Sequence, residues 1–134
     1  MDSTPTNTAP SGIILILEPD AVLRSVLHDI LNATGSVIRG AQDLGVAIDK
    51  AKEAPPELLV TAHYVDCVSG YDAANIIRKY CPDMDVLVLA GFPADDRIDN
   101  RLLNNAFSSF PPPYRPALLL DHVRKLLQAR AERR

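Results

Sequence analysis

The chain has 134 residues, of which 47% are hydrophobic and 23% charged, and its net charge is −3. This length and composition predict one globular domain that is long enough to bury a core. The lack of a basic stripe argues against nucleic-acid binding, and no apolar run approaches the roughly 18 residues that a membrane-spanning helix needs. We therefore predict a soluble, cytoplasmic protein with no nucleic-acid or membrane partner.

The two ends of the chain differ in composition from its middle. Residues 1–11 are rich in Ser, Thr, Pro and Asn and lack the basic start and apolar stretch of a signal peptide, so we predict a disordered tail. A single domain is predicted over residues 12–130, followed by a short basic end at 131–134. Cys67 and Cys81 lack the spacing of a zinc or redox motif, which indicates free thiols in a reducing compartment.

The first predicted element is a strand over Ile13–Leu17. Its unbroken apolar run is typical of a strand that is buried on both faces of a parallel sheet. Asp20 is the predicted N-cap of a helix over 22–31, whose apolar positions form one wide face. Gly35 is the predicted C-cap of that helix, and Val37–Ile38 is a short second strand.

The middle of the chain repeats this pattern. Apolar residues at helical spacing predict a second helix over 43–53, and a third strand follows over 57–62. Ser69 is the predicted N-cap, in a capping box, of a third helix that Pro82 closes. A fourth, fully apolar strand is predicted over 85–90.

The last third of the chain predicts two further helices and one further strand. A fourth helix with a thin apolar stripe starts after Pro93, a weaker fifth strand covers 106–110, and a last helix starts at Pro116. The chain therefore consists of five repeats of a strand and then a helix. Such alternation predicts an α/β fold with a doubly wound parallel sheet and right-handed crossovers.

Three stretches resemble the receiver domain of two-component response regulators. They are the acidic turn at 18–20 after the first strand, the stretch 56–70 around the third strand, and 113–116 at the start of the last helix. The resemblance covers residues 12–128 and implies a flavodoxin-like fold, (βα)5, with strand order 2-1-3-4-5. It also implies a function in two-component, or phosphorelay, signal transduction.

Four positions that carry the chemistry of a receiver hold other residue types here. The resemblance places Ala62 at the phosphoacceptor Asp, Pro19 at the main metal-ligand Asp, Ala90 at the Thr or Ser, and Pro112 at the Lys. A methyl group cannot accept a phosphoryl group, and phosphoryl transfer relies on cations that stabilise charge. The resemblance therefore implies a degenerate receiver, or pseudo-receiver, that acts independently of phosphorylation and has no catalytic residue.

The remaining acidic residues do not restore the missing chemistry. The six positions of this degenerate pocket are Glu18, Pro19, Asp20, Ala62, Ala90 and Pro112. Two carboxylates alone are a poor ligand set for Mg²⁺, so we predict no metal and no cofactor. Asp66, four residues beyond Ala62, is interpreted as a solvated loop carboxylate rather than a displaced phosphoacceptor.

The three histidines form no recognisable site in the sequence. His63 follows Ala62 in an extended segment and is expected to point away from the pocket. His28 and His122 are expected on the surfaces of the first and last helices, and three scattered histidines do not predict a metal site. No phosphate-binding glycine motif or nucleophile elbow is present, so we predict that the chain is not an enzyme.

We therefore predict a signalling module that binds a protein partner, either a signalling protein or a second copy of itself. In receivers, the face formed by the fourth helix, fifth strand and fifth helix commonly docks partners. The candidate interface residues on that face are Arg97, Ile98, Arg101, Leu102, Tyr114, Arg115 and His122. The alternative hypothesis is a small-ligand-binding module that uses the pocket left by the missing charged residues.

Overall fold

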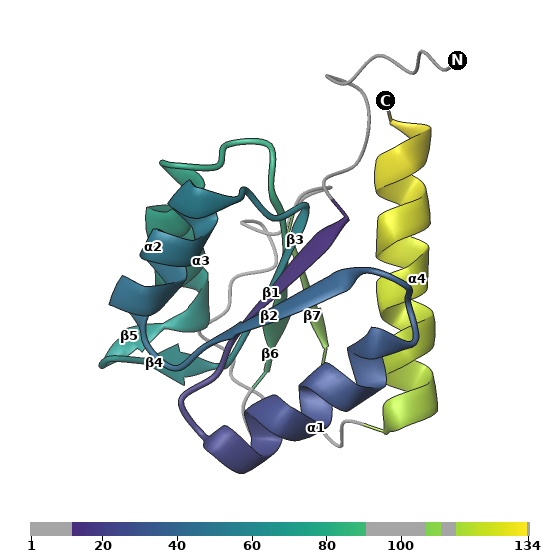
Figure 1. The fold of residues 1–134 in the computed structure, drawn as a ribbon, viewed down its shortest axis with the longest axis horizontal. Coiled ribbons are helices and arrows are strands. Elements are labelled where there is room, and N and C mark those ends of the chain that lie inside the picture. The colour runs from purple at the N-terminus through teal and green to yellow at the C-terminus, as the bar shows by residue number, and fades with distance from the viewer. Residues whose placement is uncertain (1–11, 91–106, 111–114, 134) are drawn as a thin grey trace.

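The computed structural model describes residues 12–90, 107–110 and 115–133. These residues form a five-stranded parallel sheet in the order β2-β1-β3-β6-β7, with helices on both faces (Figure 1). The helices α2 and α3 cover one face of the sheet, and α1 and α4 cover the other. The α/β class, the flavodoxin-like topology and the strand order predicted from the sequence are confirmed.

The strands of the sheet are β1 (Ile13–Leu17), β2 (Val37–Ala41), β3 (Leu58–Thr61), β6 (Asp85–Leu89) and β7 (Phe107–Phe110). The helices are α1 (Ala21–Asn32), α2 (Leu44–Glu53), α3 (Gly70–Arg78) and α4 (Pro116–Glu132). A small hairpin of β4 (Tyr64–Val65) and β5 (Val68–Ser69) lies between β3 and α3. The fourth helix predicted after Pro93 lies outside the described residues.

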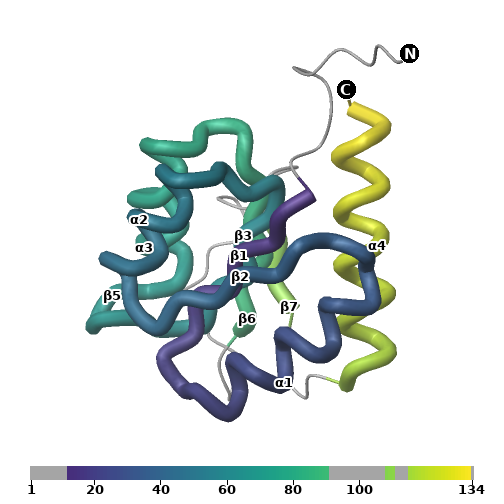
Figure 2. Tube along the Cα trace, in the orientation of Figure 1, coloured from purple at the N-terminus to yellow at the C-terminus, as the bar shows by residue number. Residues whose placement is uncertain are grey.

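The core has two layers because successive side chains of each buried strand point to opposite faces of the sheet. On β1, Ile14 and Ile16 pack with residues of α1 and α4, whereas Leu15 and Leu17 pack with residues of α2 and α3. The same alternation holds along β3 and β6, so the central strands are buried on both faces. The tube in Figure 2 shows α1 and α4 side by side over one of these layers.

Three of the helices begin at side-chain caps that satisfy their first backbone N–H groups. Asp20 accepts hydrogen bonds from the backbone N–H groups of Val22 and Leu23, and Ser69 accepts one from that of Asp72. Asp43 caps α2 in the same way, through the N–H of Val46. The predicted caps at Asp20 and Ser69 are confirmed, and α4 begins at Pro116 as predicted.

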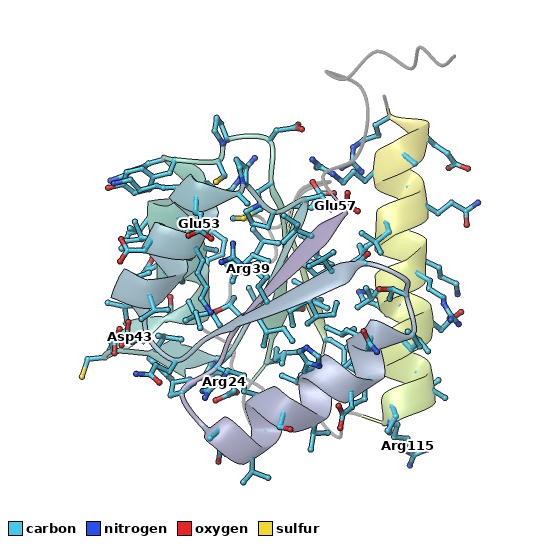
Figure 3. All side chains as sticks on the ribbon, viewed as in Figure 1. Arg24, Arg39, Asp43, Glu53, Glu57 and Arg115 are labelled. Atoms are coloured by element: carbon cyan, nitrogen blue, oxygen red, sulfur yellow. The ribbon has the colours of Figure 1, made fainter. Side chains whose placement is uncertain are left out.

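Two local predictions differ from the structure. The second strand is longer than predicted and includes Arg39 and Gly40, because its backbone pairs with all five residues of β1 whatever its side chains are. Arg39 lies on the α2 side of the sheet, where its guanidinium contacts the Glu53 carboxylate at 2.6 Å (Figure 3). The C-cap of α1 is Ala33, and Gly35 lies two residues further on with a φ of +84°.

Charged residues attach the end of α4 to the amino end of β6. Arg130 is buried, and its guanidinium lies 2.9 Å from the Asp83 carboxylate and 3.3 Å from that of Asp85. Arg133 contacts the other oxygen of Asp85 at 2.6 Å. The structure thus gives Arg130 a buried carboxylate partner, Asp85, which the sequence alone did not indicate.

Replacing Arg130 with methionine tests this attachment. Met fills a similar volume but leaves the buried Asp85 with Arg133 alone, so we expect a loss of about 3 kcal/mol in unfolding free energy, the lower end of the range for removing one partner of a buried pair. Urea denaturation measures this loss. The control is Lys125→Ala, which removes an exposed ion pair with Asp121 and is expected to change stability by less than about 0.5 kcal/mol. Equal effects of the two substitutions would contradict the attachment.

Candidate functional site

Three chain segments meet at the carboxyl edge of the sheet. In the parallel register Leu17 pairs with Thr61, and Thr61 pairs with Val88, so the residues that follow these strands emerge together. Open α/β sheets bind their ligands at this edge. The structure therefore brings Glu18, Ala62 and Ala90 to one end of three adjacent strands, in agreement with the pocket predicted from the sequence.

The three residues at this edge have little exposed surface. Glu18 is 7% exposed, and Ala62 and Ala90 are each 8% exposed. Their backbone N–H groups donate hydrogen bonds to neighbouring strands or segments: Glu18 to Ala41, Ala62 to Leu17, and Ala90 to Phe110. The two methyl groups thus sit on a fixed backbone and offer neither a nucleophile nor a hydrogen-bonding group.

Both remaining carboxylates at this edge accept hydrogen bonds from the backbone. A Glu18 carboxylate oxygen accepts from the N–H of Asp20 at 2.9 Å, and an Asp20 carboxylate oxygen accepts from the first turn of α1. Burial raises the pKa of Glu18, and the hydrogen bond from Asp20 opposes that rise. Glu18 and Asp20 therefore stabilise the local turn and the start of a helix.

Arg24, on the first turns of α1, turns back toward the end of β1. Its Nη1 donates to the backbone carbonyl of Glu18 at 2.7 Å and lies 3.5 Å from that of Pro19. Figure 3 shows Arg24 between the start of α1 and β2. The sequence analysis did not single out Arg24, because nothing local distinguishes it from an ordinary exposed helix residue.

The segment after Ala62 is the β4–β5 hairpin, which the sequence analysis interpreted as a plain loop. Its two turn residues, Asp66 and Cys67, both have positive φ, at 51° and 66°, as a type I′ turn requires. The exposed Asp66 carboxylate accepts a hydrogen bond from the N–H of Leu44 at 2.8 Å. Asp66 therefore helps to cap α2 instead of standing only in solvent.

Gly70 sets the distance between the start of α3 and the end of β3. A Cβ at position 70 would lie 2.0 Å from the backbone oxygen of Ala62, which is far inside van der Waals contact. The N–H of Gly70 donates to the carbonyl of His63 at 2.7 Å. Glycine is therefore required here by the close approach of two backbone segments.

Comparison with known proteins supports the resemblance to receiver domains. No protein-family model matches the chain. The chemotaxis protein CheY of Thermotoga maritima is 23% identical over 114 residues, which cover 84% of this chain and 95% of that protein. The chain thus resembles CheY-like receiver domains in sequence.

Solved structures agree with this result at the level of the fold. A CheY-like response regulator receiver domain protein from Methanospirillum hungatei is similar with a TM-score of 0.79 and 20% identity, over 91% of this chain and 98% of that one. The receiver domain from the hybrid histidine kinase CckA is similar with a TM-score of 0.70 and 23% identity, over 87% and 99% of the two chains. The resemblance to response-regulator receivers is thus confirmed, whereas the degenerate character of the site stays a prediction.

Most of the predicted interface lies outside the described residues. Pro112 of the predicted pocket is also outside them, as are the interface residues Arg97, Ile98, Arg101, Leu102 and Tyr114. Arg115 is exposed at the start of α4 (Figure 3). His122 is half-buried, with its ring 5.4 Å from that of Phe110, and is not a surface residue as expected. Burial lowers the pKa of His122, and Lys125 adds to that effect.

The other histidine and cysteine residues considered from the sequence take ordinary positions in the fold. His63 is partly buried and contacts the ring of Tyr64 edge-on at 4.5 Å. Cys67 and Cys81 are both free thiols, as predicted, the first exposed and the second buried. Across the described ranges, no three His, Cys, Asp or Glu side chains are grouped closely enough to hold a metal ion.

Among the helices of the described segments, none is long and apolar enough to cross a membrane.

Substituting Gly70 with alanine tests the close approach at the site. The new methyl group must displace the backbone of Ala62, so we expect a loss of about 1–3 kcal/mol despite the better helix propensity of alanine. Urea denaturation gives the difference. Gly45→Ala is the matched control, since a Cβ there would meet only the Asp43 side chain at 3.5 Å, and we expect stability unchanged or slightly raised. Equal stability of the two variants would contradict the packing described here.

Replacing Glu18 with glutamine tests the burial of its charge. Because the folded-state pKa of Glu18 is raised, the folded protein holds this proton more tightly than the unfolded chain, and stability falls as pH rises from about 4.3 through the folded-state pKa. Gln keeps the acceptor for the Asp20 N–H and does not titrate. We therefore expect Glu18→Gln to raise the melting temperature at pH 7 by more than at pH 4.

The control for this substitution is Glu132→Gln, at an exposed carboxylate near the end of α4. We expect its melting temperature to follow that of the original protein at both pH values. The contrary result would be a Glu18→Gln variant whose stability, measured relative to that of the original protein, is lower at pH 7 than at pH 4. That result would show that the Glu18 carboxylate is stabilised by its surroundings.

Proposed function

We propose that the chain is a signalling receiver domain that works by protein–protein contact and independently of phosphorylation. The observation that carries this proposal is the composition of the carboxyl edge of the sheet. Two buried methyl groups, Ala62 and Ala90, follow β3 and β6 there, and the carboxylates of Glu18 and Asp20 are bonded to the backbone. Phosphoryl transfer works through positioning and charge stabilisation, and among the described residues the ends of β3 and β6 offer no carboxylate nucleophile for it.

A displaced phosphoacceptor is not supported by the geometry of the nearby carboxylates. Asp66 lies on the hairpin turn and bonds to the first turn of α2, whereas Asp20 bonds to the first turn of α1. Each carboxylate thereby stabilises a helix terminus, where a negative charge is favoured by the backbone dipoles. A covalent phosphoryl group on either residue would break a helix cap.

The donor set at the carboxyl edge also does not fit Mg²⁺, the metal that receivers use. Mg²⁺ requires oxygen ligands in near-octahedral geometry and is usually bound by one or two carboxylates that can turn toward it. Glu18 is buried and holds the turn at Asp20, Pro19 has no side-chain donor, and Arg24 adds a positive charge beside the same carbonyl groups. We therefore derive no step through a metal ion.

A receiver domain of this kind acts through the surface that it presents. The exposed Arg115 and Leu118 at the start of α4 belong to the face through which receivers dock partners, and Arg is among the residues enriched in interfaces. The proposed partner is a signalling protein or a second copy of the chain, and no reaction is catalysed. Small-ligand binding in the pocket at Ala62 stays a prediction, since Pro112 lies outside the described residues.

Treatment with Mg²⁺ and a phosphodonor tests phosphorylation independence. The chain is incubated with acetyl phosphate for intact-mass measurement, and with beryllofluoride for amide NMR shifts. We expect no mass adduct and no shift at Ala62 or Ala90. An aspartyl adduct would overturn the proposal, and Asp66→Asn and Asp20→Asn variants would then locate it.

A gain-of-function variant serves as the positive control for this experiment. The triple substitution Pro19→Asp, Ala62→Asp and Pro112→Lys restores the residue types that receivers carry at these positions. A stoichiometric adduct on this variant alone would show that the scaffold can support the reaction and that the native residues prevent it.

A further inference from the structure

A cavity of about 260 Å³ lies between α1 and β2, on the face of the sheet that α1 covers. It is lined by Ile16, Ala21, Arg24, Ser25, His28 and Gly40. The proposed function does not use this cavity. Of the residues that line the cavity, only Arg24 also makes one of the contacts described at the carboxyl edge. It is smaller than the ~300–1,000 Å³ of sites for drug-sized ligands, so its size fits a small compound.

Gly40 forms part of the wall of the cavity on the strand side, opposite the polar face of α1. Gly40 on the edge strand β2 pairs in register with Ile16 of β1. A Cβ on Gly40 would lie 3.2 Å from the Cδ of Arg24, so the stem of Arg24 passes over the space that a larger residue would occupy. Residues 21, 24, 25 and 28 have the spacing of one helix face, which places them together against this space.

The polar groups around the cavity are suited to an anion. The Arg24 guanidinium has five N–H donors. Toward the described part of the chain, only those on Nη1 form hydrogen bonds, and their acceptors are uncharged backbone carbonyls. Within the described residues, no carboxylate lies within ion-pair distance of Arg24. The Ser25 hydroxyl and the His28 ring add further hydrogen-bonding groups on the same face of α1.

Two acidic groups lie near these donors, and the positive charge of Arg24 opposes the rise in the pKa of one of them, Glu18. The Asp29 carboxylate is 4.0 Å from His28 Nδ1, but it is 84% exposed and therefore strongly screened by solvent. The Glu18 carboxylate is buried and bonds to the Asp20 N–H, while Arg24 donates to its backbone carbonyl. The buried side chain of Ile16, with the methyl group of Ala21, gives the cavity an apolar part as well.

We propose that this cavity binds a small organic anion. Its acidic group lies against Arg24, Ser25 and His28, and its short apolar part lies against Ile16 and Ala21. Arginine suits such a group because its planar fork of donors matches a carboxylate or a phosphoryl group. Since Arg24 also holds the carbonyls of Glu18 and Pro19, an occupied cavity fixes the turn between β1 and α1.

Amide NMR titration of the full chain tests this proposal with four probes: butyrate, phenyl phosphate, inorganic phosphate and the neutral butanamide. We expect saturable shifts at Ala21, Arg24, Ser25 and Gly40 with butyrate or phenyl phosphate, and at least tenfold weaker binding of butanamide. The two organic anions distinguish a carboxylate from a phosphoryl ligand. Stronger binding of inorganic phosphate than of either would show that the apolar part contributes nothing and would overturn the proposal.

Variants locate the binding. Gly40→Val fills the cavity from the strand, where a β-branched residue is favourable, so we expect binding to weaken at least tenfold with the melting temperature retained. Ser25→Ala removes one hydrogen-bonding group, and we expect a several-fold loss. Gly45→Ala, on α2, is the matched glycine control and is expected to bind like the original chain.

Three results would overturn the proposal. Equal binding of butanamide would show an apolar cavity with no anion preference. Undiminished binding by Gly40→Val would place the ligand elsewhere, and so would shifts confined to other residues. Absence of saturable shifts up to ~20 mM, well above a Kd of about 1 mM, would exclude a site. None of these results bears on phosphorylation, so the two proposals are tested separately.

Discussion

The central strand β1 has no face turned toward solvent. Ile14 and Ile16 contact the layer of α1 and α4, Leu15 and Leu17 contact the layer of α2 and α3, and each is at most 1% exposed. Burial of one such side chain contributes about 1.5–3 kcal/mol to folding stability. Because β1 buries side chains on both faces of the sheet, it fixes both core layers at once. Because β2 and β3 pair with β1 in parallel, the turn after β1 and the hairpin after β3 must emerge at the same edge, which creates the site.

Much of this fold could be predicted from the sequence because it depends on local patterns. The apolar runs gave the central strands, and the side chains of Asp20 and Ser69 marked two helix starts. The positions of Glu18, Ala62 and Ala90 at one edge followed from the register of a parallel sheet. The features that could not be predicted depend on residues distant in sequence: Arg130 meets Asp85 across 45 residues, and Asp66 meets Leu44 across 22. Arg24 was missed because its partners are backbone carbonyls, which leave no mark in the sequence.

Under the proposed function, the carboxyl edge keeps a receiver-like scaffold while the phosphorylation chemistry is replaced. A cluster of acidic groups at one edge is costly to fold, since each buried charge loses hydration and repels its neighbours. Here the methyl groups of Ala62 and Ala90 remove that cost at two strand ends, and Glu18 and Asp20 bond to the backbone. Under the proposed function, this edge serves the stability of the domain, and recognition passes to its outer faces.

The β4–β5 hairpin has a consequence for how this region opens. It is held by its own strand pairing, by the bond from Leu44 to Asp66, and by the Ser69 cap on α3. Its turn keeps two non-glycine residues in the left-handed region, which costs about 1–2 kcal/mol for each and persists only where the surroundings enforce it. The segment after β3 is therefore tied by hydrogen bonds to the first turns of both α2 and α3, so local opening of the hairpin would also loosen the starts of both helices.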